Sequence, residues 1–145
     1  MCIRDSLQTE WPELDVYLTS VTDHYATISV CGPESKRIIS TVIPDLDLSD
    51  ENFPHMSFRN AKIGKINCRV MRISFTGELS YEINIQADYG EAVWKKCMES
   101  GKEFKITPYG TEAMHLLRAE KGFVIVGQET DGTVCLLYTS DAADE

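Results

Sequence analysis

The stretch RISFTGELSYEIN, residues 72–84, carries the clearest fold signal in this chain of 145 residues. An alternating segment runs into Thr76-Gly77-Glu78, turns, and leaves as a second alternating segment. In the second segment apolar residues alternate with polar ones, as in a strand that has one buried face. The stretch therefore predicts a β-hairpin. It also places a carboxylate, Glu82, inside a strand, where glutamate is disfavoured.

Outward from this hairpin, the same kind of pattern predicts the other elements. Runs rich in β-branched and aromatic residues predict strands at Asp15–Val21, Tyr25–Val30, Met56–Ile63, Lys65–Phe75, Ser80–Gln86 and Phe123–Gly127. Helices are expected from Pro33 to about Val42, from Asp88 to Gly101, and from Thr107 or Thr111 to Gly122. This order predicts an α+β fold with a mainly antiparallel sheet and helices packed on one side.

Both ends of the chain are interpreted as non-native. Codons can be chosen for MCIRDS, residues 1–6, whose complementary strand encodes CLLYT, the beginning of residues 135–145. One inverted repeat can thus account for both ends, which resemble the transposase and adapter sequences of sequencing libraries. An ordinary polar tail with chance complementarity is the alternative. We expect residues 7–134 to be one partial native domain and exclude the ends from fold reasoning.

The composition of residues 7–134 restricts the class of function. They contain 13 Lys and Arg and 19 Asp and Glu, a net charge of −6. This acidic balance argues against nucleic-acid binding, which needs clustered cations. No apolar run reaches the roughly 20 residues that a membrane span requires. The three cysteines in this range have no CxxC spacing, which favours reduced thiols and a cytoplasmic location over disulfides or a zinc site.

No standard catalytic motif is present. The chain has no GxGxxG, P-loop or GxSxG sequence, and its three histidines lack metal-ligand spacing, so no metal is expected. The residues alone leave two interpretations of Glu82 open: a solvated strand residue or a ligand anchor. Glu78 is most simply a solvated turn residue, and Arg118 and Glu120 most simply form a helix-end pair.

Three motifs carry a family resemblance: SFTGELSYEI (74–83), TPYGTEAMHLLRAEKGF (107–123) and VGQETDGTV (126–134). In this order and spacing they resemble the folate-binding domain shared by aminomethyltransferases, the glycine-cleavage T-proteins, and folate-linked amine oxidases. Two further segments, LQTEWPELDVYLTSVT (7–22) and FPHMSF (53–58), are most similar to the alpha subunits of heterotetrameric sarcosine oxidases. The resemblance covers essentially all of residues 7–134.

The resemblance implies an enzyme that oxidises sarcosine at a flavin in a partner subunit. The one-carbon unit then reaches tetrahydrofolate in this domain, giving 5,10-methylenetetrahydrofolate and glycine, and oxygen reoxidises the flavin with release of peroxide. Flavin and NAD are expected elsewhere in the full hetero-oligomer. The alternatives are a glycine-cleavage aminomethyltransferase, the folate domain of a dimethylglycine dehydrogenase, and a non-catalytic folate-binding scaffold.

The resemblance also implies roles for single residues. Glu82 matches the family glutamate that hydrogen-bonds the amino-pyrimidinone edge of the pterin, and a carboxylate suits that edge because it offers two acceptor oxygens to adjacent N–H donors. The other expected folate-binding residues are Phe75, Tyr81 and Arg118, and the expected turn and support residues are Gly77, Glu78 and Glu120.

Two positions depart from the family pattern. Phe75 stands where relatives often carry a tyrosine, so any role of that hydroxyl is in doubt. Met114 stands where T-proteins have an arginine for the glutamate tail of folate, so this carboxylate contact must come from elsewhere. The catalytic aspartate of the family lies upstream of this chain. We therefore expect a fragment that holds part of a folate site, has no catalytic residue of its own and is inactive alone.

Overall fold

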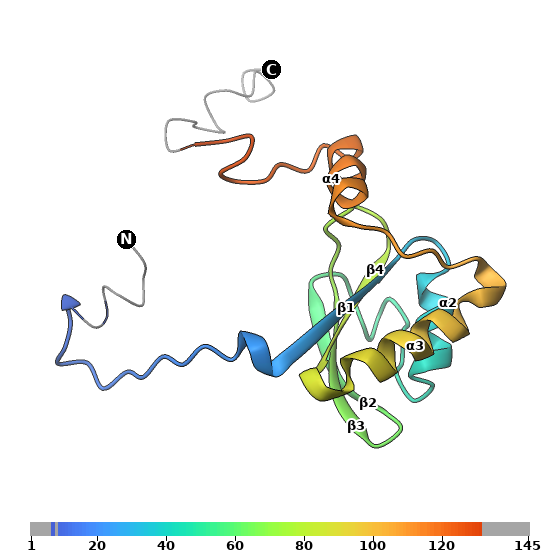
Figure 1. Ribbon diagram of the computed structural model, residues 1–145, viewed down its shortest axis with the longest axis horizontal. Coiled ribbons are helices and arrows are strands. Elements are labelled where there is room, and N and C mark those ends of the chain that lie inside the picture. Colours follow the sequence, from blue (N-terminus) through green and yellow to red (C-terminus); the bar gives the residue numbers. More distant parts are fainter. Residues whose placement is uncertain (1–6, 8, 132–145) are drawn as a thin grey trace.

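The structure is a computed structural model in which residues 7 and 9–131 are described. Along the chain, strand β1 is followed by helix α2, strands β2 to β4 and helices α3 and α4 (Figure 1). Their bounds are β1 Tyr25–Cys31, α2 Ser35–Val42, β2 Ser57–Ile63, β3 Ile66–Arg72, β4 Ser80–Gln86, α3 Gly90–Ser100 and α4 Thr111–Glu120. The segments predicted to be adapter-derived, residues 1–6 and 135–145, lie outside the described residues.

The four strands form one antiparallel sheet in the order β1-β4-β3-β2. Strand β4 is therefore an inner strand, paired with β1 on one side and β3 on the other. Helices α2 and α3 pack together and contact the sheet (Figure 1). The arrangement confirms the predicted α+β fold with a mainly antiparallel sheet.

The core fills the space between the sheet and helices α2 and α3. On β4, Tyr81, Ile83 and Ile85 are fully buried, and the Tyr81 ring packs on Phe53 with ring centroids 5.9 Å apart. The two helices contribute Ile38, Ile39, Val42, Val93 and Cys97 to the same cluster. Because strand residues alternate between faces, burial of these three β4 residues turns the residues between them away from the core.

Those residues belong to the second face of the sheet, which we call the open face. Residues that are paired across strands point to the same face, so the register identifies its members. The open face contains Thr27 and Ser29 of β1, Glu82 and Asn84 of β4, and Arg69 and Met71 of β3. None of these six side chains belongs to the buried core.

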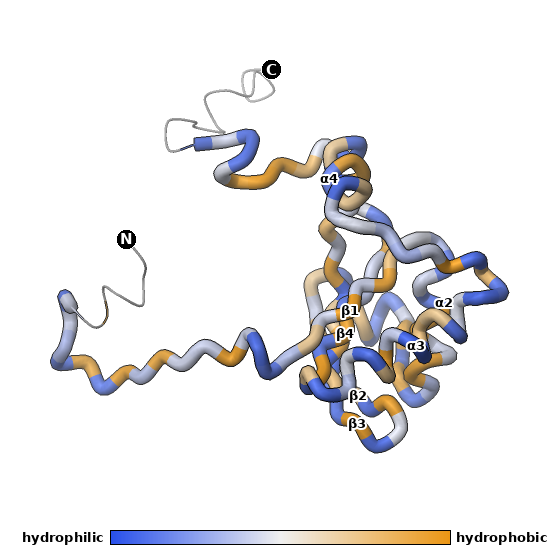
Figure 2. Tube along the Cα trace, in the orientation of Figure 1, coloured by the Kyte–Doolittle hydropathy of each residue, from blue (hydrophilic) through white to orange (hydrophobic). Residues whose placement is uncertain are grey.

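Two predicted strands are wrong. Residues 15–21 form no strand, and their apolar side chains Val16, Tyr17, Leu18 and Val21 are exposed. Residues 123–127 form only an isolated bridge, between Val126 and Thr130, on the apolar segment that follows α4 (Figure 2). Both segments have strand-like composition, but the four-stranded sheet does not pair with either of them in the described chain.

The three predicted helices are present, and two of them, α2 and α3, begin two residues later than predicted. Helix α2 begins at Ser35, two residues after Pro33. The predicted cap at Asp88 is wrong, because Asp88 lies in a 3₁₀ turn and Tyr89 is the N-cap of α3 without a side-chain cap bond. Helix α4 begins at Thr111, the later of the two predicted starts. Among the described residues, no helix has the length and apolarity needed to cross a membrane.

Candidate functional site

Glu82 lies on the inner strand β4, on the open face. Its neighbours across the two adjacent strands are Ser29 of β1 and Met71 of β3. The side chain is partly buried, and this burial raises the pKa of the Glu82 carboxyl above its ordinary value. Within residues 9–131, no cation forms an ion pair with it. Glu82 is thus a partly desolvated carboxylate on a strand that is paired on both sides, and it keeps its capacity to accept hydrogen bonds.

Three of the predicted site residues belong to the β3–β4 loop, residues 73–79, which contacts α4. The Glu78 carboxylate is 3.1 Å from the Lys121 ammonium group. Gly77 has a positive φ of 78°, and a Cβ at this position would lie 2.5 Å from Cγ of Lys121. Lys121 was not identified from the sequence. Gly77 and Glu78 therefore hold the loop against the end of α4.

We expect Gly77→Ala to lower the free energy of unfolding by about 1–2 kcal/mol, because an L residue at positive φ is strained and the new methyl group would displace Lys121. Urea denaturation of the chain measures this loss. Gly64→Ala is the matched control, since Gly64 also has a positive φ, 62°, but has nothing within 4 Å of the added Cβ. Equal losses in the two variants would contradict the close contact between Gly77 and Lys121.

Phe75 belongs to the same loop and is 41 % exposed. Its ring meets the ring of His115 on α4 edge-on, with centroids 6.0 Å apart. Nδ1 of His115 is buried and has no hydrogen-bond partner. Phe75 is therefore oriented by α4 and keeps an accessible face, as a side chain that packs on a flat ligand requires.

Tyr81 and Arg118 are both buried, unlike Glu82. Tyr81 is fully buried on the core side of β4, opposite to Glu82. Arg118 is 6 % exposed; its Nη1 donates to the carbonyl oxygen of Phe123 at 2.9 Å, and its Nη2 donates to Glu129. The Tyr81 side chain thus packs in the core on the face of β4 opposite to Glu82. Arg118 hydrogen-bonds the segment after α4 to the helix. Glu120 lies exposed at the end of α4.

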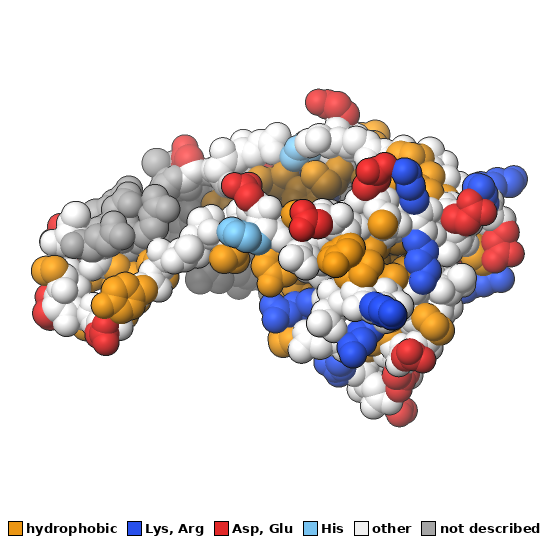
Figure 3. All heavy atoms as spheres, turned by 60° about the horizontal axis from the view of Figure 1, so that its bottom comes forward, with side chains coloured by type: hydrophobic (Ala, Val, Ile, Leu, Met, Phe, Trp, Pro, Cys, Tyr) orange, Lys and Arg blue, Asp and Glu red, His pale blue; other side chains and the backbone are white. Residues whose placement is uncertain are grey.

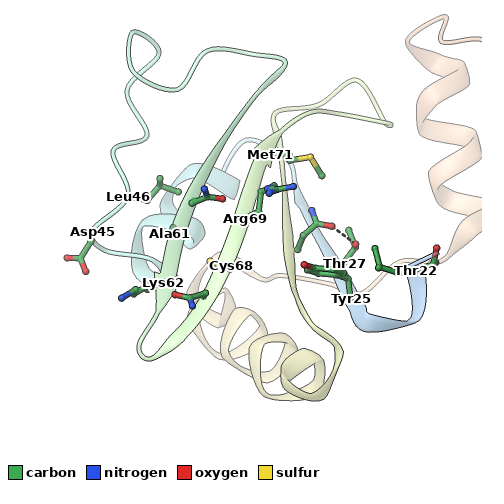
Figure 4. A pocket seen from close by; sticks show the side chains of 14 residues that line it. Thr22, Tyr25, Thr27, Asp45, Leu46, Ala61, Lys62, Cys68, Arg69 and Met71 are labelled. Carbon is green, nitrogen blue, oxygen red and sulfur yellow. Dashed lines mark hydrogen bonds between the residues drawn. The ribbon is translucent and has the colours of Figure 1, made fainter. Parts of the chain in front are cut away.

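Two hollows border the open face and the β1 edge. The larger one is lined by polar residues from all four strands, among them Thr27, Asn60, Arg69 and Asn84 (Figure 4). The smaller one, about 320 Å³, lies between β1, α3 and residues 106–111 and includes Met114. Of the residues named here, the sequence analysis had discussed only Met114. The alternation Asn67, Arg69, Met71 in β3 is the signal that could have identified Arg69.

A comparison of the sequence with known protein families assigns the chain to one of them. The family described as GCVT N-terminal domain matches residues 2–139. The chain belongs to this family. The GCVT N-terminal domain thus accounts for the sheet with its inner strand β4, for the β3–β4 loop and for α4, which carry the motifs that first indicated the resemblance.

Individual relatives agree with this assignment. The chain is 53 % identical over 133 residues to the "Sarcosine oxidase subunit alpha" of Corynebacterium sp. (strain P-1). This match covers 91 % of the chain and 14 % of the relative. It is 34 % identical over 115 residues to the mitochondrial "Dimethylglycine dehydrogenase" of Rattus norvegicus, covering 79 % of the chain and 13 % of the relative. An "Aminomethyltransferase" of Thermoanaerobacter sp. (strain X514) is 34 % identical over 116 residues, and this match covers 79 % of the chain and 31 % of the relative. The chain thus spans a small part of the relatives it matches.

Proposed function

We propose that this GCVT N-terminal domain is part of the tetrahydrofolate-binding region of a sarcosine-oxidase-type enzyme. Sarcosine would lose two electrons at a flavin in another subunit, and oxygen would accept them to form peroxide. The one-carbon unit would pass to tetrahydrofolate in this domain, leaving glycine and 5,10-methylenetetrahydrofolate. The 53 % identity to a sarcosine oxidase alpha subunit supports this proposal over the 34 % identity to an aminomethyltransferase.

The observation that carries the proposal is the partly buried carboxylate of Glu82 on an inner strand, which forms no ion pair with any described residue. Pairing with β1 and β3 fixes its backbone, so it can select a rigid ligand edge. The amino-pyrimidinone edge of a pterin presents adjacent N–H donors, and an ionised carboxylate accepts two such hydrogen bonds side by side. The chemistry of Glu82 therefore fits a reduced folate.

The remaining predicted site residues would support this anchor. Phe75 would pack against the ligand with its exposed face, and Gly77 and Glu78 would hold the loop that carries it. Tyr81 would fix β4 from the core side, and Arg118 would fix the segment after α4. We propose that the catalytic aspartate, the flavin and NAD belong to parts of the enzyme outside this chain. The free thiols of Cys31, Cys68 and Cys97 support a cytoplasmic location.

The test is a product analysis of the full-length enzyme assembly that contains this chain. Sarcosine is supplied in the presence and in the absence of tetrahydrofolate, and 5,10-methylenetetrahydrofolate, free formaldehyde and peroxide are measured. We expect the folate product to replace free formaldehyde while peroxide stays equal. A parallel reaction with dimethylglycine in place of sarcosine distinguishes a sarcosine oxidase from a dimethylglycine dehydrogenase. Release of the same formaldehyde with and without tetrahydrofolate would refute the proposal.

A further inference from the structure

The open face of the sheet continues across β3 onto β2, which is an edge strand within the described chain. Residues that are paired across two strands point to the same side of the sheet. By this rule six side chains of the β2–β3 hairpin lie on the open side, and we call them the hairpin face: Phe58, Asn60 and Lys62 of β2, and Asn67, Arg69 and Met71 of β3. Helices α2 and α3 pack on the opposite side of the sheet, so neither of them covers this face.

Phe58 gives the hairpin face an exposed aromatic centre. Its side chain is 52 % exposed, and Met56, just before β2, is 76 % exposed. The guanidinium group of Arg69 lies 5.0 Å from the centroid of the Phe58 ring. This cation–π contact holds both side chains in place, so a partner would order them at little cost in conformational entropy. Aromatic residues, methionine and arginine are the residue types that are enriched at protein interfaces.

The hairpin face is basic although the whole chain has a net charge of −9. It carries Lys62 and Arg69 and no acid, and Lys65 in the turn between the two strands adds a third exposed cation. Within the described residues none of these three forms an ion pair. Among the residues that line the larger hollow, Asp45 is the only acid, and its side chain points away from the sheet (Figure 4). Seen from the side of this hairpin, Lys and Arg side chains gather among hydrophobic ones (Figure 3).

The charge and the aromatic centre together indicate the class of partner. Nucleic acids and anionic membranes are bound by larger arrays of cations, because each phosphate contact contributes little by itself. Three cations around an exposed phenylalanine instead match a protein surface that carries carboxylates around an apolar recess. Arginine binds a carboxylate with two parallel hydrogen bonds, which gives such a contact its direction.

We propose that the hairpin face docks onto an acidic surface of another subunit of the enzyme that contains this chain. Phe58 fills an apolar recess at the centre of the contact, and Arg69 pairs with a carboxylate beside it. The inference rests on the proposed function in one respect, that this enzyme has further subunits. The docking surface is centred on β2 and β3, whereas Glu82 lies on β4, so the surface and the proposed pterin anchor are different parts of the sheet.

The experiment measures the affinity between the subunits of the complete enzyme assembly by mass photometry over a dilution series, at low and at high ionic strength. We expect Arg69→Glu to weaken the affinity by about 100-fold at low salt and by less at high salt, because salt screens the new repulsion. Phe58→Ala should weaken it by about tenfold at both salt concentrations. Lys95→Glu is the matched control, since it changes the net charge equally on the exposed surface of α3, on the other side of the sheet. It should change the affinity by less than about threefold.

A photoreactive phenylalanine analogue in place of Phe58 identifies the partner by cross-linking within the assembly. We expect a cross-link to another subunit, next to aspartate or glutamate. A cross-link to the same polypeptide or to a second copy of it, or no cross-link, would overturn the proposal. So would equal losses in Arg69→Glu and Lys95→Glu, or binding of the assembly to anionic lipid vesicles or DNA that Arg69→Glu alone abolishes. If Arg69→Glu does not fold, Phe58→Ala and the cross-link decide.

The failure of this proposal is distinguishable from the failure of the proposed function. An assembly that still forms 5,10-methylenetetrahydrofolate, but whose subunit affinity is unchanged in Arg69→Glu and Phe58→Ala, would keep the function and reject the docking surface. An enzyme that purifies as one type of subunit would contradict both.

Discussion

Replacing Glu82 with glutamine is expected to weaken the binding of tetrahydrofolate by about 10- to 100-fold. Glutamine keeps the shape of the side chain but replaces one acceptor oxygen with a donor, which then meets a donor of the pterin. A buried donor that loses its acceptor costs about 1–3 kcal/mol, and more when the partner was charged. Calorimetric titration of the full-length protein measures the change. Tetrahydropteroate, which has the pterin but lacks the glutamate, should lose affinity to the same extent, because the substitution acts at the pterin end of the ligand.

The same substitution should leave the ligand-free protein at least as stable as the wild type. Burial raises the pKa of Glu82, so ionisation in the folded state is unfavourable and the contribution of this group to stability declines as the pH rises through its folded pKa. Glutamine does not ionise. The melting temperatures of the variant and the wild type should therefore agree at low pH, and the variant should melt higher at neutral pH.

The control is Glu78→Gln, which removes a carboxylate that is paired with Lys121 on the same hairpin. This variant should lose no more than about fivefold in affinity for tetrahydrofolate, because the half-exposed Glu78–Lys121 pair supports the loop with at most about 1 kcal/mol. If Glu82→Gln kept wild-type affinity, Glu82 would not belong to the site. If Glu78→Gln lost affinity equally, the general negative charge of the hairpin would explain the effect.

The sheet could be predicted largely because its strands alternate strictly. Strand β4 has the predicted bounds, Ser80–Gln86, and β1 extends the predicted strand by one residue, to Cys31. Each has one apolar face that the helices bury, so the sequence pattern and the burial agree. The segments 15–21 and 123–127 have similar composition, but composition does not reveal whether a partner strand is present. Pairing is a property of the whole sheet, and for these two segments the local pattern was insufficient.

The site was predictable in part for a similar reason. Glu82 stood out because glutamate is disfavoured within a strand and because it lies in the motif SFTGELSYEI. Arg69 and Asn84 lie outside the three family motifs, and only the register of the sheet brings them together. The LRAE motif indicated that Arg118 matters. It could not indicate that the guanidinium group is engaged by Phe123 and Glu129, because those contacts depend on how the chain turns after α4.

That engagement of Arg118 supports a further prediction. Both oxygens of Glu129 are used, one by Arg118 and the other by the backbone N–H of Ile125 at 2.7 Å. These two hydrogen bonds lower the pKa of Glu129, the one from Arg118 most. In Arg118→Met, which keeps the length of the side chain but removes its donors, Glu129 should no longer be held. We expect hydrogen-exchange protection of the Ile125 amide to fall by about 10- to 100-fold, because hydrogen bonds to charged groups are among the strongest in proteins.

The pH dependence separates this explanation from a general loss of packing. Because the pKa of Glu129 is lowered, its contribution is present above the ordinary carboxyl value of 4.5 and is lost as the pH falls through the folded pKa. Protection of Ile125 in the wild type, corrected for intrinsic exchange, should therefore decline in acid, whereas Arg118→Met should show a flat profile. Arg37→Met is the control, since Arg37 pairs with Glu34 on an exposed helix surface. An equal loss of Ile125 protection in Arg37→Met, or an acid decline that persists in Arg118→Met, would show that Arg118 does not hold this segment.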